Sequence, residues 1–141
     1  MHAVRHADRV PWLTAEAVTA DDIPALVQAA VERGVAITVV TDLHCNRNGN
    51  DFKSGFTDAC TLLTAAGATV NLAHNIHNKT ICVDRNCMVE GSFNWLSAVR
   101  DRKHRYQRAE MSIAYSGPEA AVFIDAAVKN MEARRIFLPE T

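Results

Sequence analysis

One short segment of the chain carries four side chains that could bind and attack a phosphate group. Residues 74–97 read HNIHNKTICVDRNCMVEGSFNWLS, with His77 and Lys79 before an apolar centre and Ser92 and Asn94 after it. Lysine supplies positive charge, serine and asparagine supply directed donors, and histidine can attack or transfer a proton near neutral pH. Together these groups suit a tetrahedral anion.

The apolar centre of this segment predicts a β-hairpin. The runs KTICVD and CMVEGSFN read as two short strands around a tight turn. A turn centred on Arg85 and Asn86 would make Val83 face Met88. A bulge of one residue at the turn would shift this register, so the pairing is a hypothesis.

In that register the two polar flanks form one site. His77 falls opposite Asn94, and Lys79 falls opposite Ser92. Because strand side chains alternate, all four project from the same face of the hairpin. The face within each pair does not depend on the register. Extended backbone alone puts His77 on the same face as Lys79, and it puts Ser92 on the same face as Asn94.

The spacing of these residues also matches a family signature. HNK is followed after four residues by Asp84 and after six more by GSFN, which resembles the HxK(x)4D(x)6GSxN signature of the phospholipase D superfamily. Every fixed position is present. GSFNWLS and the basic stretch after it look more like bacterial nuclease-type domains, including those attached to DNA-processing ATPases, than like the large lipid-cleaving enzymes.

The resemblance implies a role for each motif residue. His77 would be the nucleophile, and Lys79, Ser92 and Asn94 would bind the phosphate. Glu110 would contact the other ring nitrogen of His77 and stabilise the imidazolium. Family members usually carry Asn two positions before this acid, where this chain has an arginine, so a solvated carboxylate at a strand edge stays the alternative.

Two further motif positions are expected to be structural, and a nearby histidine is expected to lie outside the site. Asp84 would form hydrogen bonds at the turn. Gly91 would permit close backbone approach to a ligand. His74 matches no motif position, so we expect a surface histidine at a strand end.

A basic stretch follows the motif. Residues 100–108, RDRKHRYQR, hold five Lys or Arg against one Asp, a local formal charge of +4. This stretch joins the motif to the expected strand that bears Glu110, so Arg102, Lys103 and Arg105 could hold a polyanion at the mouth of the site. A solvated loop is the alternative.

Alternating helices and strands must position this motif, which predicts an α/β fold with a mixed sheet. The expected helices cover residues 21–34, 53–67 and 118–135, and the expected strands cover residues 35–42, 68–74, 79–84, 87–94 and 109–116. The run 35–42 is apolar on both alternating sets, as in a parallel strand covered on two faces, and Asp42 marks its carboxyl end. RVPWLT, within residues 1–21, is either a shortened first strand or the sign of a truncated domain.

Bulk composition limits the class of protein. A chain of 141 residues with 48% hydrophobic residues is the size of one domain, so we expect residues 1–141 to form a single domain. The net charge of −1 means that affinity for a polyanion must come from a local patch. The four cysteines form no C-x-x-C pair, which favours reduced thiols in the cytoplasm. The sequence shows no spacing typical of metal ligands and no apolar run long enough to span a membrane.

The resemblance to the phospholipase D superfamily implies a phosphodiesterase that uses no metal or other cofactor. The leading hypothesis is an endonuclease that cleaves DNA or RNA through a phosphohistidine. Because the chain has one motif where similar enzymes use two, we expect a homodimer with a shared active site and no stable membrane association. The alternatives are a lipid phosphodiesterase or phosphatidyl transferase, and a nucleic-acid-binding domain of a larger DNA-processing ATPase without turnover of its own.

Overall fold

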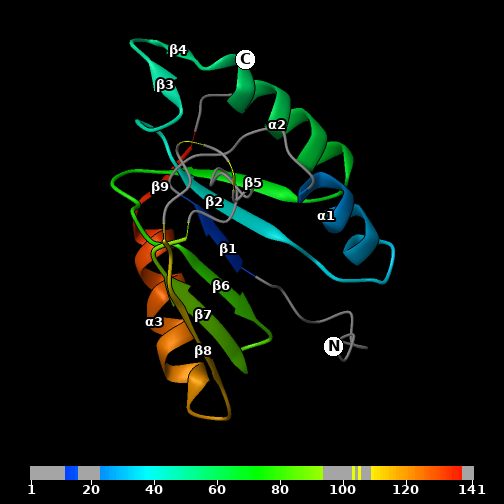
Figure 1. Ribbon diagram of the computed structural model, residues 1–141, viewed down its shortest axis with the longest axis vertical. Helices are drawn as coiled ribbons and strands as arrows, with labels where there is room; N and C mark the ends of the chain where they lie inside the picture. Colours follow the sequence, from blue (N-terminus) through cyan, green and yellow to red (C-terminus); the bar gives the residue numbers. More distant parts are fainter. Residues whose placement is uncertain (1–11, 16–22, 94–102, 104, 106–108, 138–141) are drawn as a thin grey trace.

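A computed structural model describes residues 12–15, 23–93, 103, 105 and 109–137. Within these residues, a seven-stranded mixed sheet has the strand order β8-β7-β6-β1-β2-β5-β9 (Figure 1). The sheet strands are β1 (Trp12–Ala15), β2 (Thr38–Asp42), β5 (Thr69–Ala73), β6 (Thr80–Val83), β7 (Cys87–Gly91), β8 (Ser112–Ser116) and β9 (Arg135–Ile136). The helices are α1 (Ile23–Val31), α2 (Ser54–Ala65) and α3 (Ala120–Ala133). The predicted α/β fold with a mixed sheet is confirmed.

The central strand β2 forms as its sequence predicts. It pairs in parallel with β1 on one side and with β5 on the other. Val39 and Val40 point to opposite faces, and both are buried, with 0% and 2% of their surface exposed. A parallel strand covered on two faces therefore explains why this run is apolar at successive positions.

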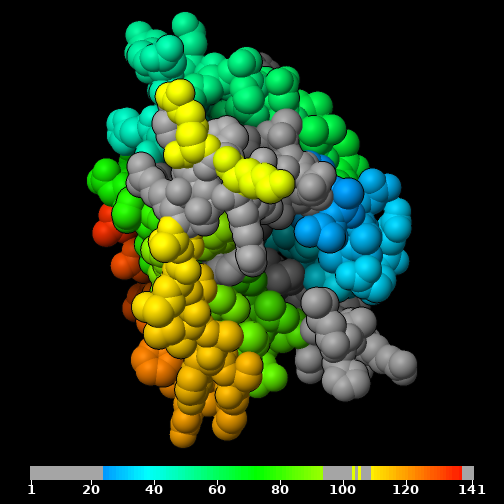
Figure 2. Space-filling model, viewed as in Figure 1, coloured from blue at the N-terminus to red at the C-terminus, as the bar shows by residue number. Residues whose placement is uncertain are grey.

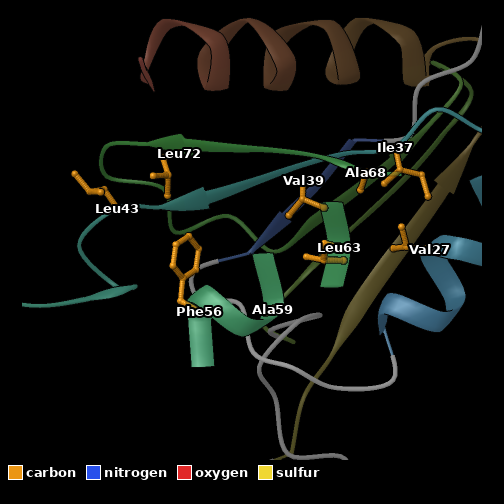
Figure 3. Packing of buried hydrophobic residues seen from close by; sticks show 9 residues of the cluster. All are labelled: Val27, Ile37, Val39, Leu43, Phe56, Ala59, Leu63, Ala68 and Leu72. Atoms are coloured by element: carbon orange, nitrogen blue, oxygen red, sulfur yellow. The ribbon is translucent and has the colours of Figure 1, made fainter. Parts of the chain in front are cut away.

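Helices cover both faces of the sheet. On one face, Val27 of α1 and Leu63 of α2 pack in a buried cluster with Val39 and Leu72. Figure 3 shows nine residues of this cluster between the sheet and these two helices, with α3 on the opposite side. On the α3 face, Met131 packs near Val40, so the sheet is the middle layer of three.

The hairpin forms, but the predicted register is wrong. Val83 pairs with Cys87, not with Met88. Three residues lie between the paired positions, and two of them, Asp84 and Arg85, have positive φ angles of 54° and 56°. These are not the Asn-Gly or Gly-Gly residues that usually indicate such a turn, so the sequence carries no clear signal for it.

Three short elements have no counterpart in the predicted strands. The hairpin of β3 (Arg47–Asn48) and β4 (Asp51–Phe52) follows β2, and β9 pairs antiparallel with β5 at one edge of the sheet. By contrast, RVPWLT does contribute a strand, because β1 lies between β2 and β6. In the described part of the chain, no helix is long and apolar enough to cross a membrane.

Candidate active site

His77 and Lys79 lie in an irregular segment between β5 and β6. His77 is exposed, whereas only 6% of Lys79 is exposed. The ammonium of Lys79 donates a hydrogen bond of 2.7 Å to the backbone carbonyl of His77. A largely buried positive charge is therefore fixed directly beside an exposed imidazole-bearing residue.

Ser92 and Glu110 meet where β7 and β8 come together. Ser92 follows the end of β7, and its backbone N–H donates a hydrogen bond of 3.0 Å to the carbonyl of Met111. Its hydroxyl donates a hydrogen bond of 2.5 Å to Oε2 of Glu110 and accepts one of 3.2 Å from the backbone N–H of Met111. The pairing of β7 with β8 thus brings Glu110 to the motif. Its predicted contact with the ring of His77 stays a prediction.

The two halves of the motif lie at the same end of the hairpin. Thr80, the first residue of β6, pairs with Glu90, and their side chains also form a hydrogen bond. Lys79, just before Thr80, and Gly91, just after Glu90, therefore lie at the same end of the hairpin. The observed register corrects the expected pairing of Lys79 with Ser92, because β7 ends at Gly91 and Ser92 is outside the β6–β7 ladder.

The two motif positions expected to be structural lie at the β6–β7 turn and at the end of β7, and the hydrogen-bonding role of the Asp84 side chain stays a prediction. Asp84 is the first residue of the β6–β7 turn, which is closed by a hydrogen bond of 3.0 Å from the N–H of Asn86 to the carbonyl of Val83. At Gly91, an added Cβ would lie 2.4 Å from the carbonyl oxygen of Met111. Gly91 is therefore required by the close approach of the segment that leads into β8, a reason that the sequence does not reveal.

Two predicted residues, Asn94 and Arg102, lie outside the described residues. Of the basic stretch, Lys103 and Arg105 are described, and both are exposed. His74 follows β5 and is also exposed, as expected of a surface histidine at a strand end.

The hairpin also carries a thiol, that of Cys82 in β6. Burial, together with the nearby charges of Glu90 and Cys87, raises the pKa of the Cys82 thiol to about 11, so this thiol is protonated near neutral pH and is a poor nucleophile. Among the described residues, no group of three or more His, Cys, Asp or Glu side chains could hold a metal ion.

The sequence did not indicate an apolar cavity beside Ser92. The cavity has a volume of about 570 Å³ and lies between β7, β8 and α3. Its lining includes Met111, Ile113 and Phe123, which are 74%, 68% and 60% exposed. Figure 2 shows the residues of β8, in gold, at the molecular surface. The large apolar residues of AEMSIAYS alternate with small or polar ones, which indicates a strand with one apolar face. The pattern does not show whether that face is exposed or packs inside the protein.

A second missed feature is Asp42, whose buried carboxylate accepts a hydrogen bond from the backbone N–H of Ile76, next to His77. Its position at the carboxyl end of β2 was visible in the sequence. The residue that it contacts was not, because that residue lies 34 positions further along the chain.

This chain belongs to the phospholipase D-like domain family, because the family model described as cardiolipin synthase, PLD-like domain, matches residues 2–131. The fold resembles that of Nuc from Salmonella typhimurium, a phospholipase D family member, with a TM-score of 0.73 and 21% identity over 98% of this chain and 87% of that one. NucT from Helicobacter pylori is similar with a TM-score of 0.63 and 16% identity over 92% and 82% of the two chains. Polyphosphate kinase from Porphyromonas gingivalis has a TM-score of 0.67 and 12% identity, over 94% of this chain and 22% of that one. No curated protein matches the chain.

Proposed function

We propose that the protein is a metal-independent phosphodiesterase, and specifically an endonuclease, in which His77 attacks phosphorus. The observation that carries this proposal is the exposed His77 beside the largely buried ammonium of Lys79, 2.7 Å from the His77 carbonyl. A fixed cation next to a nucleophile favours binding of a phosphodiester and stabilises negative charge that develops on its oxygens. Membership of the phospholipase D-like family supports the same class of reaction.

The proposed reaction has two displacements. A ring nitrogen of His77 forms a bond to phosphorus while the bond to the leaving oxygen breaks, and that oxygen takes a proton from a second imidazole. The second imidazole then removes a proton from water, whose oxygen attacks phosphorus and breaks the phosphorus–nitrogen bond. The products are an alcohol and a phosphate monoester, and both imidazoles return to their starting states.

The second imidazole comes from another copy of the chain. Each chain carries one copy of the motif, so a two-fold axis would place the partner subunit's His77 across the phosphate. The apolar surface of β8 and of Met111, the residue before it, supports this arrangement, because it adjoins Ser92 and leaves Met111 and Ile113 exposed. Edge strands with exposed apolar side chains readily join to a second chain, and large exposed apolar patches mark interaction sites.

Nucleic acid is the proposed substrate. Lys103 and Arg105 are exposed between the motif and the strand that follows Glu110. Cationic side chains near the site would bind the repeated phosphates of a polynucleotide and make binding sensitive to salt. We further propose that the protein acts in the cytoplasm, where it could serve a larger DNA-processing system.

A lipid phosphodiesterase is the second candidate. The cavity that ends at Ser92 is lined mainly by apolar side chains and could hold an acyl chain. A nucleic-acid-binding domain without turnover is the third candidate, and the intact motif argues against it.

A substrate panel tests the proposal. Purified protein is incubated with plasmid, single-stranded DNA, RNA and phosphatidylcholine vesicles, in excess EDTA and in magnesium, with the His77→Asn variant as control. The expected result is cleavage of nucleic acid that persists in EDTA and is abolished in the variant. Turnover of lipid alone would support the second candidate, and binding without turnover would support the third. Activity lost in EDTA and restored by magnesium would contradict the metal-independent mechanism.

A further inference from the structure

Asp42, the last residue of β2, is a buried carboxylate that contacts two separate backbone segments. Only 4% of its surface is exposed. Oδ1 accepts a hydrogen bond of 3.0 Å from the backbone N–H of Cys45, and Oδ2 accepts one of 2.9 Å from the backbone N–H of Ile76. The second bond ties the end of β2 to the residue that immediately precedes His77.

The carboxylate of Asp42 is ionised near neutral pH. Burial by itself raises the pKa of Asp42, but hydrogen bonds from the backbone N–H groups of Cys45, Ile76 and His44 outweigh it, and the pKa lies below its ordinary value. A buried charge is costly unless its oxygens accept hydrogen bonds, so the fold retains this group only with these donors in place.

The turn after β2 has a second anchor that does not reach the site. Asn46 is 1% exposed, and its side-chain amide donates hydrogen bonds of 2.9 Å to Oγ1 of Thr41 and 2.6 Å to the backbone carbonyl of Asp42. These bonds stabilise the turn locally. The bond to Ile76 is therefore an additional connection made by Asp42, beyond what the turn itself requires.

His77 is held on both sides along the backbone. The segment that bears it, residues 74–79, belongs to no strand or helix, although His74 at its start donates a backbone hydrogen bond of 3.0 Å to the carbonyl of Arg134. Before His77, the side chain of Ile76 is 3% exposed and packs near Met131, and its N–H is bound by Asp42. After His77, Lys79 binds the His77 carbonyl. Together these contacts fix the point from which the imidazole projects.

We propose that Asp42 is a positioning residue for His77, acting through the backbone N–H of Ile76. This inference rests on the proposed role of His77 as nucleophile. Displacement of an attacking group by about 1 Å can lower a rate about 100-fold, so fixing an irregular segment contributes directly to catalysis. Because Asp42 is buried, it would affect the rate of the chemical step and not the binding of substrate.

Amide hydrogen exchange of the wild-type protein gives the first test, and it is independent of activity. If Asp42 holds the segment, the Ile76 amide should exchange as slowly as that of Val39 in the central strand, and Asp42→Asn should accelerate exchange at Ile76 at least about 10-fold. A wild-type Ile76 amide that exchanges as fast as that of exposed Asn78 would overturn the inference.

Kinetics of Asp42→Asn give the second test, with a chromogenic phosphodiester such as bis(p-nitrophenyl) phosphate. We expect kcat to fall about 10- to 100-fold and KM to stay nearly constant. The matched control is Thr41→Val, which is isosteric, equally buried, and removes the bond from Asn46 but neither bond of Asp42. If both variants lose kcat equally and have equal unfolding midpoints, the positioning role is wrong and Asp42 only stabilises the fold.

The His77→Asn variant separates this inference from the proposed function. If His77→Asn retains full activity, the proposed nucleophile is wrong, whatever Asp42 does. If His77→Asn is inactive while Asp42→Asn keeps the wild-type kcat, His77 stands as nucleophile and the positioning role of Asp42 is wrong.

Discussion

Ser92 donates a hydrogen bond of 2.5 Å to Glu110, which lies 18 positions later in the chain. This bond joins the serine of the motif to an acid that the motif does not include. It therefore places a negative charge at the end of the β7–β8 pair, beside the groups proposed to bind phosphate.

Glu110→Gln tests whether this negative charge takes part in catalysis. Glutamine keeps the size of the side chain and an oxygen that can accept the Ser92 hydrogen bond, but it cannot stabilise an imidazolium by charge. We expect kcat to fall about 10- to 100-fold, with little change in the unfolding midpoint. Unchanged kcat would instead support the alternative of a solvated carboxylate at a strand edge.

Subunit mixing tests the shared active site. Wild-type protein and His77→Asn protein are mixed at several ratios and allowed to exchange subunits. A heterodimer has one usable imidazole and cannot both attack and protonate, so activity should fall with the square of the wild-type fraction. After exchange is verified, a linear fall would refute the model, as would full activity in a species that sedimentation shows to be monomeric.

Ile113→Asp tests the role of the exposed β8 surface. A buried charge at a dimer interface is strongly unfavourable, so we expect a monomer by sedimentation and loss of activity on every substrate. Leu26→Asp is the control, since Leu26 is similarly exposed, 66% against 68%, but lies on α1. A variant that stays dimeric and loses only lipid turnover would assign this surface to an acyl chain.

Gly91→Ala tests the close approach of β8 to the motif. The added methyl group would meet the Met111 carbonyl at 2.4 Å, so we expect the free energy of unfolding to fall by about 1–3 kcal/mol in urea. Gly55→Ala is the control. Gly55 lies in α2 with no atom within 4 Å of an added Cβ, and alanine there should raise stability by about 0.5–1 kcal/mol. Equal midpoints for the two variants would contradict this account of Gly91.

The lowered pKa of Asp42 predicts a specific loss of stability in acid. Because the pKa is lower in the folded state than in the unfolded state, the unfolded state binds more protons as pH falls. The stabilisation is fully present above about pH 4, near the ordinary aspartate pKa, and is lost as pH falls through the folded-state value. Urea midpoints of wild type and Asp42→Asn should therefore converge in acid. A constant gap from pH 7 to pH 2 would contradict the assignment.

The sequence by itself predicted features that depend on local pattern. Capping and spacing identified α1, α2 and α3, the two-faced apolar run identified β2 as a parallel strand, and the signature identified His77, Lys79 and Ser92 as motif residues. These signals are local because side-chain periodicity and turn chemistry depend on near neighbours.

Tertiary structure decided which distant residues meet and in which register. The turn at Asp84 and Arg85 has positive φ angles without glycine, so the sequence did not indicate it. The predicted pairing of Val83 with Met88 was therefore wrong by one residue, because Val83 pairs with Cys87. The 34-residue separation of Asp42 from the Ile76 N–H, and the approach of β8 that requires Gly91, could not be predicted either. Both contacts form only when the strands lie side by side in the sheet. The order of the strands depends on how the whole sheet packs against its helices, so no single stretch of sequence determines it.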